Sequence, residues 1–137
     1  IKLSDEDLTW LDAARRGGES TSEVLDKKNL RIAAAHLLDQ SSASMIVVTL
    51  GSAGAFSITR KPGESEMEVS VNAAETTSLA DTVGAGDVFG ATLLATLVRK
   101  DRLSAEAVQS MGQAEVETLL GKAALAAAMN CEAAGCQ

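Results

Sequence analysis

The stretch DTVGAGDVFGA (residues 81–91) places three glycines and two aspartates at the start of an apolar run. Three structures have such a pattern: a dinucleotide-binding fingerprint, a phosphate-binding turn beside an acidic residue, and a tight turn that only begins a core helix. A dinucleotide fingerprint requires G-x-G-x-x-G directly after a strand, whereas Gly84, Gly86 and Gly90 have a different spacing and follow the poor strand former SLADTV. A Walker A loop, GxxxxGK[ST], occurs nowhere in the chain.

The residues alone do not decide between the other two interpretations, the phosphate-binding turn and the plain turn. At a helix start, Gly84, Ala85 and Gly86 would leave backbone N–H groups unpaired, and their small size would let a phosphate approach closely. The helix dipole adds partial positive charge there, and Asp87 in the first turn would accept a proton from a substrate hydroxyl. Phosphoryl transfer needs little more than this. In the second interpretation, the glycines form a plain turn and Asp87 only stabilises the helix.

Composition limits the class of protein and its partners. The chain has 137 residues, of which 46% are hydrophobic and 23% charged, as is typical of one soluble globular domain. A net charge of −7 without a Lys/Arg cluster argues against nucleic acid as a partner. No apolar run approaches the roughly 20 residues of a membrane span, and the N-terminus does not resemble a signal peptide. Cys131, Cys136 and the single His36 do not match a metal site, so we expect a cytoplasmic protein with free thiols.

Hydrophobic periodicity and turn residues predict the helices and strands. Helices are predicted at residues 4–16, 23–39, 86–100, after Ser104 and at 113–129, and strands at 45–50, 55–59 and 66–72. The strand MIVVTL is apolar throughout, which favours burial in a parallel sheet. Ser4 and Asp7 have the spacing of a capping box, and Trp10 is expected to cover the core. The helix after Gly86 is apolar on more than one face, which predicts burial on more than one side.

Four stretches, in order, resemble the PfkB/ribokinase family of carbohydrate kinases. DTVGAGD (81–87) matches the family signature D-T-x-G-A-G-D in full, and VVTLGSAGA (47–55) resembles the strand and turn on its nucleotide side. KLSDEDLTWL (2–11) resembles the family's N-x-x-E region, and AAAMNCEAAGC (126–136) resembles its C-terminal helix and loop. Together they span almost the whole chain and lean toward fructokinase-like members. The resemblance therefore favours a phosphate site at residues 84–87 over a plain turn.

The resemblance implies an α/β fold that is part of the ribokinase-like one. This fold has a mainly parallel sheet flanked by helices on both faces, with an antiparallel edge, here at residues 55–72. The matched part is the C-terminal, nucleotide-binding half of such a kinase, so residues 1–137 are expected to form a single domain. The N-terminal sugar-binding half and lid are not in the chain, which also starts without methionine, as a fragment would. We expect such a half to be inactive alone and to form a homo-oligomer through its exposed sheet edge.

The resemblance also implies the function and the catalytic residues. The function is ATP-dependent phosphorylation of a sugar hydroxyl, with Asp87 as the base that deprotonates that hydroxyl. Gly84, Ala85 and Gly86 would form the anion hole for the transferred phosphate. Two further functions stay open: a non-catalytic nucleotide-binding module, and a family member that phosphorylates a nucleoside or ketodeoxygluconate.

For the nucleotide, the resemblance implies that Thr49, Gly51 and Gly54 line the ATP site, with glycine letting ATP lie against the backbone. Many family members place Asn or His beside the adenine near position 124, where this chain has Ala124. The nucleotide is thus expected at the end of the strand at residues 45–50 and the turn that follows it. The base specificity of this site is left open.

Two kinds of cation are implied as well. Asp81 and the carbonyl of Val83, with carbonyls near Asn130 and Gly135, would hold a monovalent cation, K⁺, that orders the anion hole. Mg²⁺ would arrive with ATP and be held largely through water. The family's N-x-x-E motif reads S-x-x-D here, and the capping-box interpretation of Asp7 competes with any link to magnesium.

Overall fold

The computed structural model describes residues 1–18, 23–74 and 84–132 of the chain. The elements, in chain order, are β1 (Lys2–Ser4), α1 (Asp5–Arg15), α2 (Lys27–Gln40), β2 (Met45–Thr49), the 3₁₀ turn η1 (Gly51–Ala53), β3 (Ala55–Thr59), β4 (Met67–Val71), α3 (Ala85–Arg99), α4 (Ala105–Ser110) and α5 (Gln113–Glu132). The predicted strands at 45–50, 55–59 and 66–72 and the predicted helices are confirmed, with shifts of a few residues at their ends.

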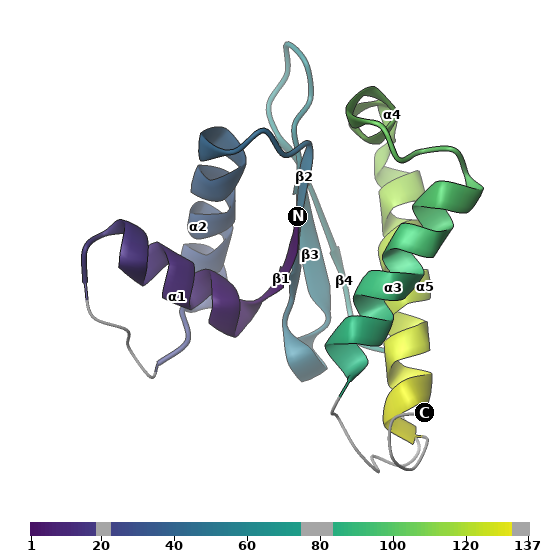
Figure 1. The fold of residues 1–137 in the computed structure, drawn as a ribbon, viewed down its shortest axis with the longest axis horizontal. Helices are drawn as coiled ribbons and strands as arrows, with labels where there is room; N and C mark the ends of the chain where they lie inside the picture. Colours follow the sequence, from purple (N-terminus) through teal and green to yellow (C-terminus); the bar gives the residue numbers. More distant parts are fainter. Residues whose placement is uncertain (19–22, 75–83, 133–137) are drawn as a thin grey trace.

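Two layers of helices enclose the sheet (Figure 1). α1 and α2 cover one face, whereas α3 and α5 lie along each other and cover the opposite face. This arrangement confirms the expected α/β architecture with helices on both sides of a sheet. Among the described residues, no helix is both long and apolar enough to cross a bilayer.

The described sheet is mixed and has the strand order β1-β2-β3-β4. β1 and β2 are parallel, whereas the β2–β3 and β3–β4 pairs are antiparallel. The antiparallel edge expected at residues 55–72 is thus confirmed, and the parallel part of the described sheet is the β1–β2 pair. The sequence does not predict β1, because three residues are too few to show an alternating pattern and pairing with distant β2 makes them a strand.

The uniformly apolar β2 is explained by burial on both faces. Successive side chains of a strand point to opposite sides. Met45 and Val47 pack in the core under α3 and α5, whereas Ile46 and Val48 pack in the core under α1 and α2. A strand between two helical layers therefore has no polar face, as its sequence predicts.

Side-chain caps begin α1, α2 and α4. The capping box of α1 is confirmed: Asp7 N–H donates to Ser4 Oγ at 3.1 Å, and Ser4 N–H donates to the Asp7 carboxylate at 3.3 Å. Ser104 caps α4 as predicted. α2 begins later than the predicted residue 23, because the Asp26 carboxylate accepts from Asn29 N–H at 2.8 Å and so ends the preceding loop.

Two expectations of burial are wrong. Trp10 is 57% exposed, because Leu8 and Asp12 lie on the buried face of α1 and Trp10 lies between them in sequence, on the opposite face. Leu94 and Val98 of α3 are 57% and 58% exposed. α3 is therefore buried mainly on its α5 and sheet side, and a second apolar face is uncovered in the described part of the chain.

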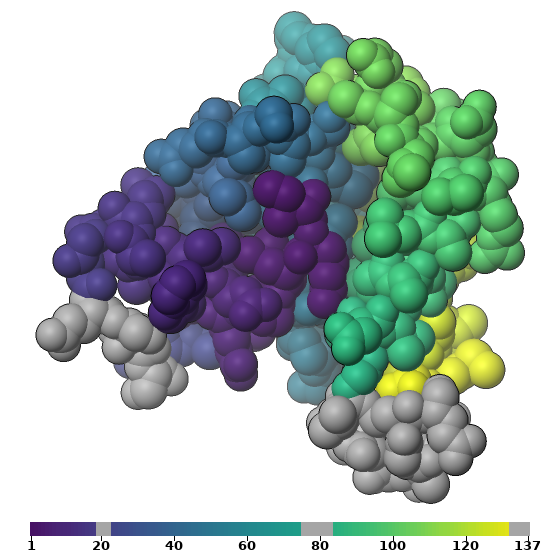
Figure 2. All heavy atoms as spheres, in the orientation of Figure 1, coloured from purple at the N-terminus to yellow at the C-terminus, as the bar shows by residue number. Residues whose placement is uncertain are grey.

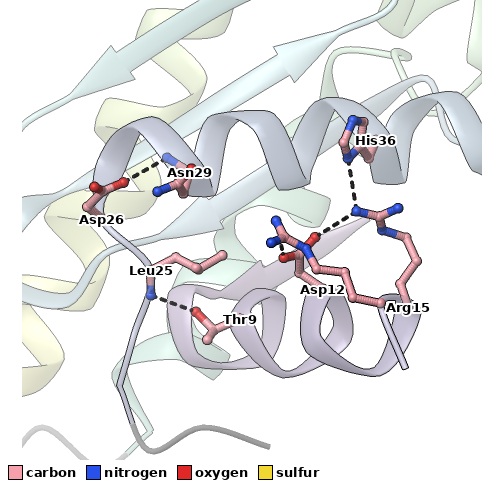
Figure 3. A network of polar contacts seen from close by, with 8 residues as sticks. Thr9, Asp12, Arg15, Leu25, Asp26, Asn29 and His36 are labelled. Atoms are coloured by element: carbon pink, nitrogen blue, oxygen red, sulfur yellow. Dashed lines mark hydrogen bonds and ion pairs between the residues drawn. The ribbon is translucent and has the colours of Figure 1, made fainter. Parts of the chain in front are cut away.

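Polar contacts join α1 to α2 (Figure 3). The Asp12 carboxylate, with only 5% of its side chain exposed, accepts ion pairs from Arg15 at 3.1 Å and Arg16 at 2.8 Å. Arg15 Nη2 lies 3.2 Å from His36 Nδ1 on α2. His36 is thus an exposed residue of α2 that contacts α1 through Arg15.

Candidate active site

The predicted site residues that the structure describes lie at one end of the sheet. β1 and β2 are parallel and end side by side, with Ser4 paired to Thr49, so their carboxyl ends share one edge. α3 begins at this end of the molecule, and α5 ends there (Figure 1). Ligands of open α/β sheets bind beyond the carboxyl ends of the parallel strands. The fold therefore brings the start of α3 to the edge where a ligand is expected.

The start of α3 has the geometry of an anion-binding turn. Gly84 is the N-cap, with a left-handed φ of 84°, and no side chain caps the helix among the described residues. Its carbonyl accepts from Val88 N–H at 3.0 Å, so the first intrahelical bond begins there. The N–H groups of Ala85, Gly86 and Asp87 then have no acceptor within the helix. These donors and the helix dipole favour an anion at this point.

Asp87 lies in the first turn of α3, beside these donors. Its side chain is exposed, and within the described residues the carboxylate has no ion pair or side-chain hydrogen bond. It therefore keeps its lone pairs available to a ligand that reaches the start of α3. This is the chemistry required of a proton acceptor at the site.

The three residues predicted to line the nucleotide site follow each other around the end of β2. Thr49 is the last residue of β2 and is half-buried. Gly51 opens η1 with a φ of 59°, and a Cβ added to it would meet no atom within 4 Å. Open space above the Gly51 backbone is what a flat ligand lying on that backbone needs.

Gly54 is a glycine for a different reason. It is buried, with φ 95° and ψ −134°, and an added Cβ would overlap the carbonyl oxygen of Val71 and lie 2.9 Å from the nitrogen of Ala73. The backbones of the η1 loop and of the end of β4 thus touch at this residue. Gly54 shapes the loop that carries Gly51 because Leu50 N–H donates to its carbonyl at 2.8 Å.

The predicted cation ligands are only partly covered by the structure. Asn130 is buried, at 7% exposure, in the last turn of α5 at the same end of the molecule. Asp81, Val83 and Gly135 lie outside the described residues. Among the residues that are described, no group of three His, Cys, Asp or Glu side chains could hold a metal ion. Asp7 is engaged with the Ser4 backbone, as the capping-box interpretation predicts.

Lys2 is a residue at this site that the sequence patterns do not single out. It lies in β1, and its side chain runs along the first turns of α3. A Cβ added to Gly90 would lie 3.8 Å from Lys2 Cδ, and one added to Gly86 would lie 3.3 Å from the ammonium nitrogen. The i,i+4 spacing of these glycines is the one sequence signal of a side chain laid across the helix.

An apolar groove adjoins the site. It has a volume of about 540 Å³, lies between the β1–β2 edge and the helices α3 and α4, and includes Lys2 and Gly90 at one side. Its apolar lining consists of Ile1, Met45, Val47, Leu93, Leu94, Leu97, Leu103, Ala105 and Val108. The exposed face of α3 forms one wall of this groove.

Comparison with known proteins identifies the family of the chain. The family model described as pfkB family carbohydrate kinase matches residues 11–137. The chain belongs to the PfkB family. A fructokinase from Rhizobium leguminosarum bv. trifolii is 34% identical over 113 residues, which are 82% of this chain and 28% of the relative. The chain thus spans less than a third of the length of this PfkB relative.

Solved structures show that the fold is ribokinase-like, as expected. A fructokinase with bound ATP from Xylella fastidiosa has a TM-score of 0.69 at 22% identity, over 99% of this chain and 37% of its own. An aminoimidazole riboside kinase from Salmonella enterica, complexed with aminoimidazole riboside and an ATP analogue, has a TM-score of 0.63 at 25% identity, over 98% and 36%. A Vibrio cholerae fructokinase in a fructose-, ADP- and calcium-bound form is 27% identical, with a TM-score of 0.57, over 99% and 35%.

Proposed function

We propose that this chain is the nucleotide-binding part of an ATP-dependent kinase that phosphorylates a sugar hydroxyl. Membership of the PfkB family and the 34% identity to a fructokinase support this proposal. The observation that carries it is the start of α3, where three unpaired N–H groups and the exposed carboxylate of Asp87 share one helical turn. A cytoplasmic location agrees with the free, buried thiol of Cys131.

In this proposal the turn at Gly84, Ala85 and Gly86 forms the anion hole, and the free N–H groups at the start of α3 and the helix dipole stabilise the charge on the transferred phosphoryl group. Asp87 accepts the proton of the sugar hydroxyl while the oxygen attacks the γ-phosphorus. The bond from that phosphorus to the oxygen of ADP breaks, and ADP departs. Every step is one of positioning, charge stabilisation and a single proton transfer, which are the requirements of phosphoryl transfer.

The nucleotide is proposed to lie over the turn after β2. The open space above Gly51 and the half-buried Thr49 support this, while Gly54 holds the loop in shape. Mg²⁺, when bound, neutralises phosphate charge, and it would be held by ATP and water because the described residues offer no cluster of acidic ligands. K⁺ is proposed at carbonyls near Asn130, together with Asp81, Val83 and Gly135.

Calorimetry on the 137-residue chain tests the nucleotide site. We expect a nonhydrolysable ATP analogue with Mg²⁺ to bind, and replacement of K⁺ by Na⁺ to weaken the binding, because the cation orders the anion hole. Adenosine, which lacks phosphates, is the control and should bind more weakly than the analogue. If the analogue gave no heat of binding, the assignment of a nucleotide site to this chain would be wrong.

A nucleoside is the second candidate acceptor. The likeness to the aminoimidazole riboside kinase, at 25% identity, favours a nucleoside over ketodeoxygluconate. Phosphate release or transfer assays with fructose, ribose and a riboside, on a protein that includes the sugar-binding half, distinguish these acceptors. The chain alone is proposed to be inactive, because it spans 28% of the fructokinase relative.

We further propose that the chain alone forms a homo-oligomer. β1 is at the edge of the described sheet, and the groove beside it exposes Leu94 and Leu103 at 57% and 59%. An unpaired strand edge beside apolar surface favours pairing with another chain. Light scattering is expected to give a mass of at least twice 14.1 kDa. Leu94→Asp should reduce the mass, and a monomer at all concentrations in the unsubstituted chain would contradict the proposal.

A further inference from the structure

The position of Lys2 is set by the sheet and by two glycines. The parallel pairing of β1 places Lys2 opposite Val47, next to α3. Its stem passes Gly90 and its ammonium reaches Gly86, which lie one turn apart on the same face of α3. Figure 2 shows the N-terminal residues, in purple, lying against α3, in green. Larger side chains at residues 86 and 90 would narrow this path, so the glycines make room for the lysine.

The ammonium of Lys2 has no bonded anion among the described residues. The ammonium of Lys2 lies at the second residue of α3, where the helix dipole is positive. The described residues provide no carboxylate or hydrogen-bond acceptor for it. Two sources of positive charge thus converge beside Asp87 and the free N–H groups of the helix. A phosphate with several negative oxygens could bind the ammonium and the free N–H groups at the same time.

We propose that Lys2 is a phosphate-binding residue of the kinase site, whose ammonium contacts the phosphoryl group that is transferred from ATP. This inference rests on the proposed function and adds a side chain to a site otherwise made of backbone donors. Lys2 does not transfer a proton in this role. Its positive charge binds the phosphoryl group and stabilises the negative charge on it during transfer. Lys2 would contact the γ-phosphate of ATP rather than the other phosphates, because the γ-phosphate is the group that lies in the anion hole.

Affinity measurements on charge-matched variants test the role of Lys2. Lys2→Met keeps the stem along Gly86 and Gly90 but removes the charge. Lys100→Met removes the same charge at the opposite end of α3, roughly 20 Å away along the helix. By calorimetry on the 137-residue chain, we expect Lys2→Met to weaken a nonhydrolysable ATP analogue about tenfold, the loss typical of one charged hydrogen bond. ADP, which lacks the γ-phosphate, should lose less affinity, and Lys100→Met should change neither.

The outcomes separate this inference from the proposed function. If the unsubstituted chain binds neither nucleotide, both proposals are overturned. If it binds the analogue and Lys2→Met binds it equally well, the inference on Lys2 fails and the nucleotide site stands. An equal loss for ADP and the analogue would also overturn it, because that pattern indicates a general disturbance rather than a contact to the γ-phosphate.

Chemical labelling gives a readout that needs no variant. Acetylation of lysine amines, followed by mass spectrometry, measures how accessible each ammonium is. The ATP analogue is expected to slow the labelling of Lys2 at least several-fold more than ADP does, while Lys100 reacts at the same rate throughout. Unchanged labelling of Lys2 in the presence of saturating analogue would exclude the contact.

Discussion

Asp87→Asn is expected to lower the turnover of a kinase containing this chain and its sugar-binding half by about 10²–10⁴-fold, the usual contribution of a general base. The amide has the shape of the carboxylate but cannot take up the hydroxyl proton. Because Asp87 is exposed and has no side-chain partner among the described residues, its replacement should leave the fold intact. Steady-state kinetics measures the loss, and calorimetry should show that ATP still binds.

Asp101→Asn is the matched control for this experiment. Asp101 follows the other end of α3, is exposed and has a φ of 54°, a left-handed conformation that asparagine also tolerates. The substitution removes the same charge far from the start of α3 and should leave turnover unchanged. Activity of Asp87→Asn within a factor of two or three of the unsubstituted kinase would exclude Asp87 as the base.

Gly54→Ala is expected to destabilise the chain by about 4 kcal/mol, through strain at a positive φ and overlap with neighbouring backbone. The added methyl group would collide with the backbone of Val71, the last residue of β4, and of Ala73, which follows it. Val71 is paired with Ala55 and cannot move without disturbing the β3–β4 pairing. Denaturant unfolding followed by circular dichroism measures the change in the free energy of unfolding.

Gly51→Ala is the control that separates the strain of a positive φ from the steric overlap expected at Gly54. Gly51 also has a positive φ, 59°, but a Cβ there meets nothing within 4 Å. Its substitution should cost only about 1–2 kcal/mol, the usual strain of a left-handed alanine. If both variants lost the same stability, the close approach at Gly54 would not be the cause. If Gly54→Ala were as stable as the unsubstituted chain, the inference that Gly54 lies against the backbone of residues 71–73 would be wrong.

Much of the fold follows from local sequence signals. The run 45–50 has no charged residue to place toward solvent, and residues 113–129 form a long alanine-rich helix without a break. Ser4 and Ser104 cap their helices as predicted because a cap depends on residues three or four apart. The motif at residues 84–87 likewise indicates the start of a helix and its acidic residue, and α3 begins there.

The features that local patterns miss all depend on distant partners. β1 exists because it pairs with β2, more than 40 residues later. Trp10 looks like a core residue by type, but its place on α1 turns it away from α2 and the sheet. Gly54 is required by the backbone of β4, which no pattern around residue 54 reveals.

The sequence by itself determines the family, the order of the main elements and the residues at the start of α3, because motif, periodicity and capping act over a few positions. Only the tertiary structure decides that Lys2 lies against Gly86, that Gly54 touches β4 and that one face of α3 is uncovered in the described chain. These contacts join segments far apart in sequence, and their geometry follows from strand pairing and helix packing, which no local pattern records.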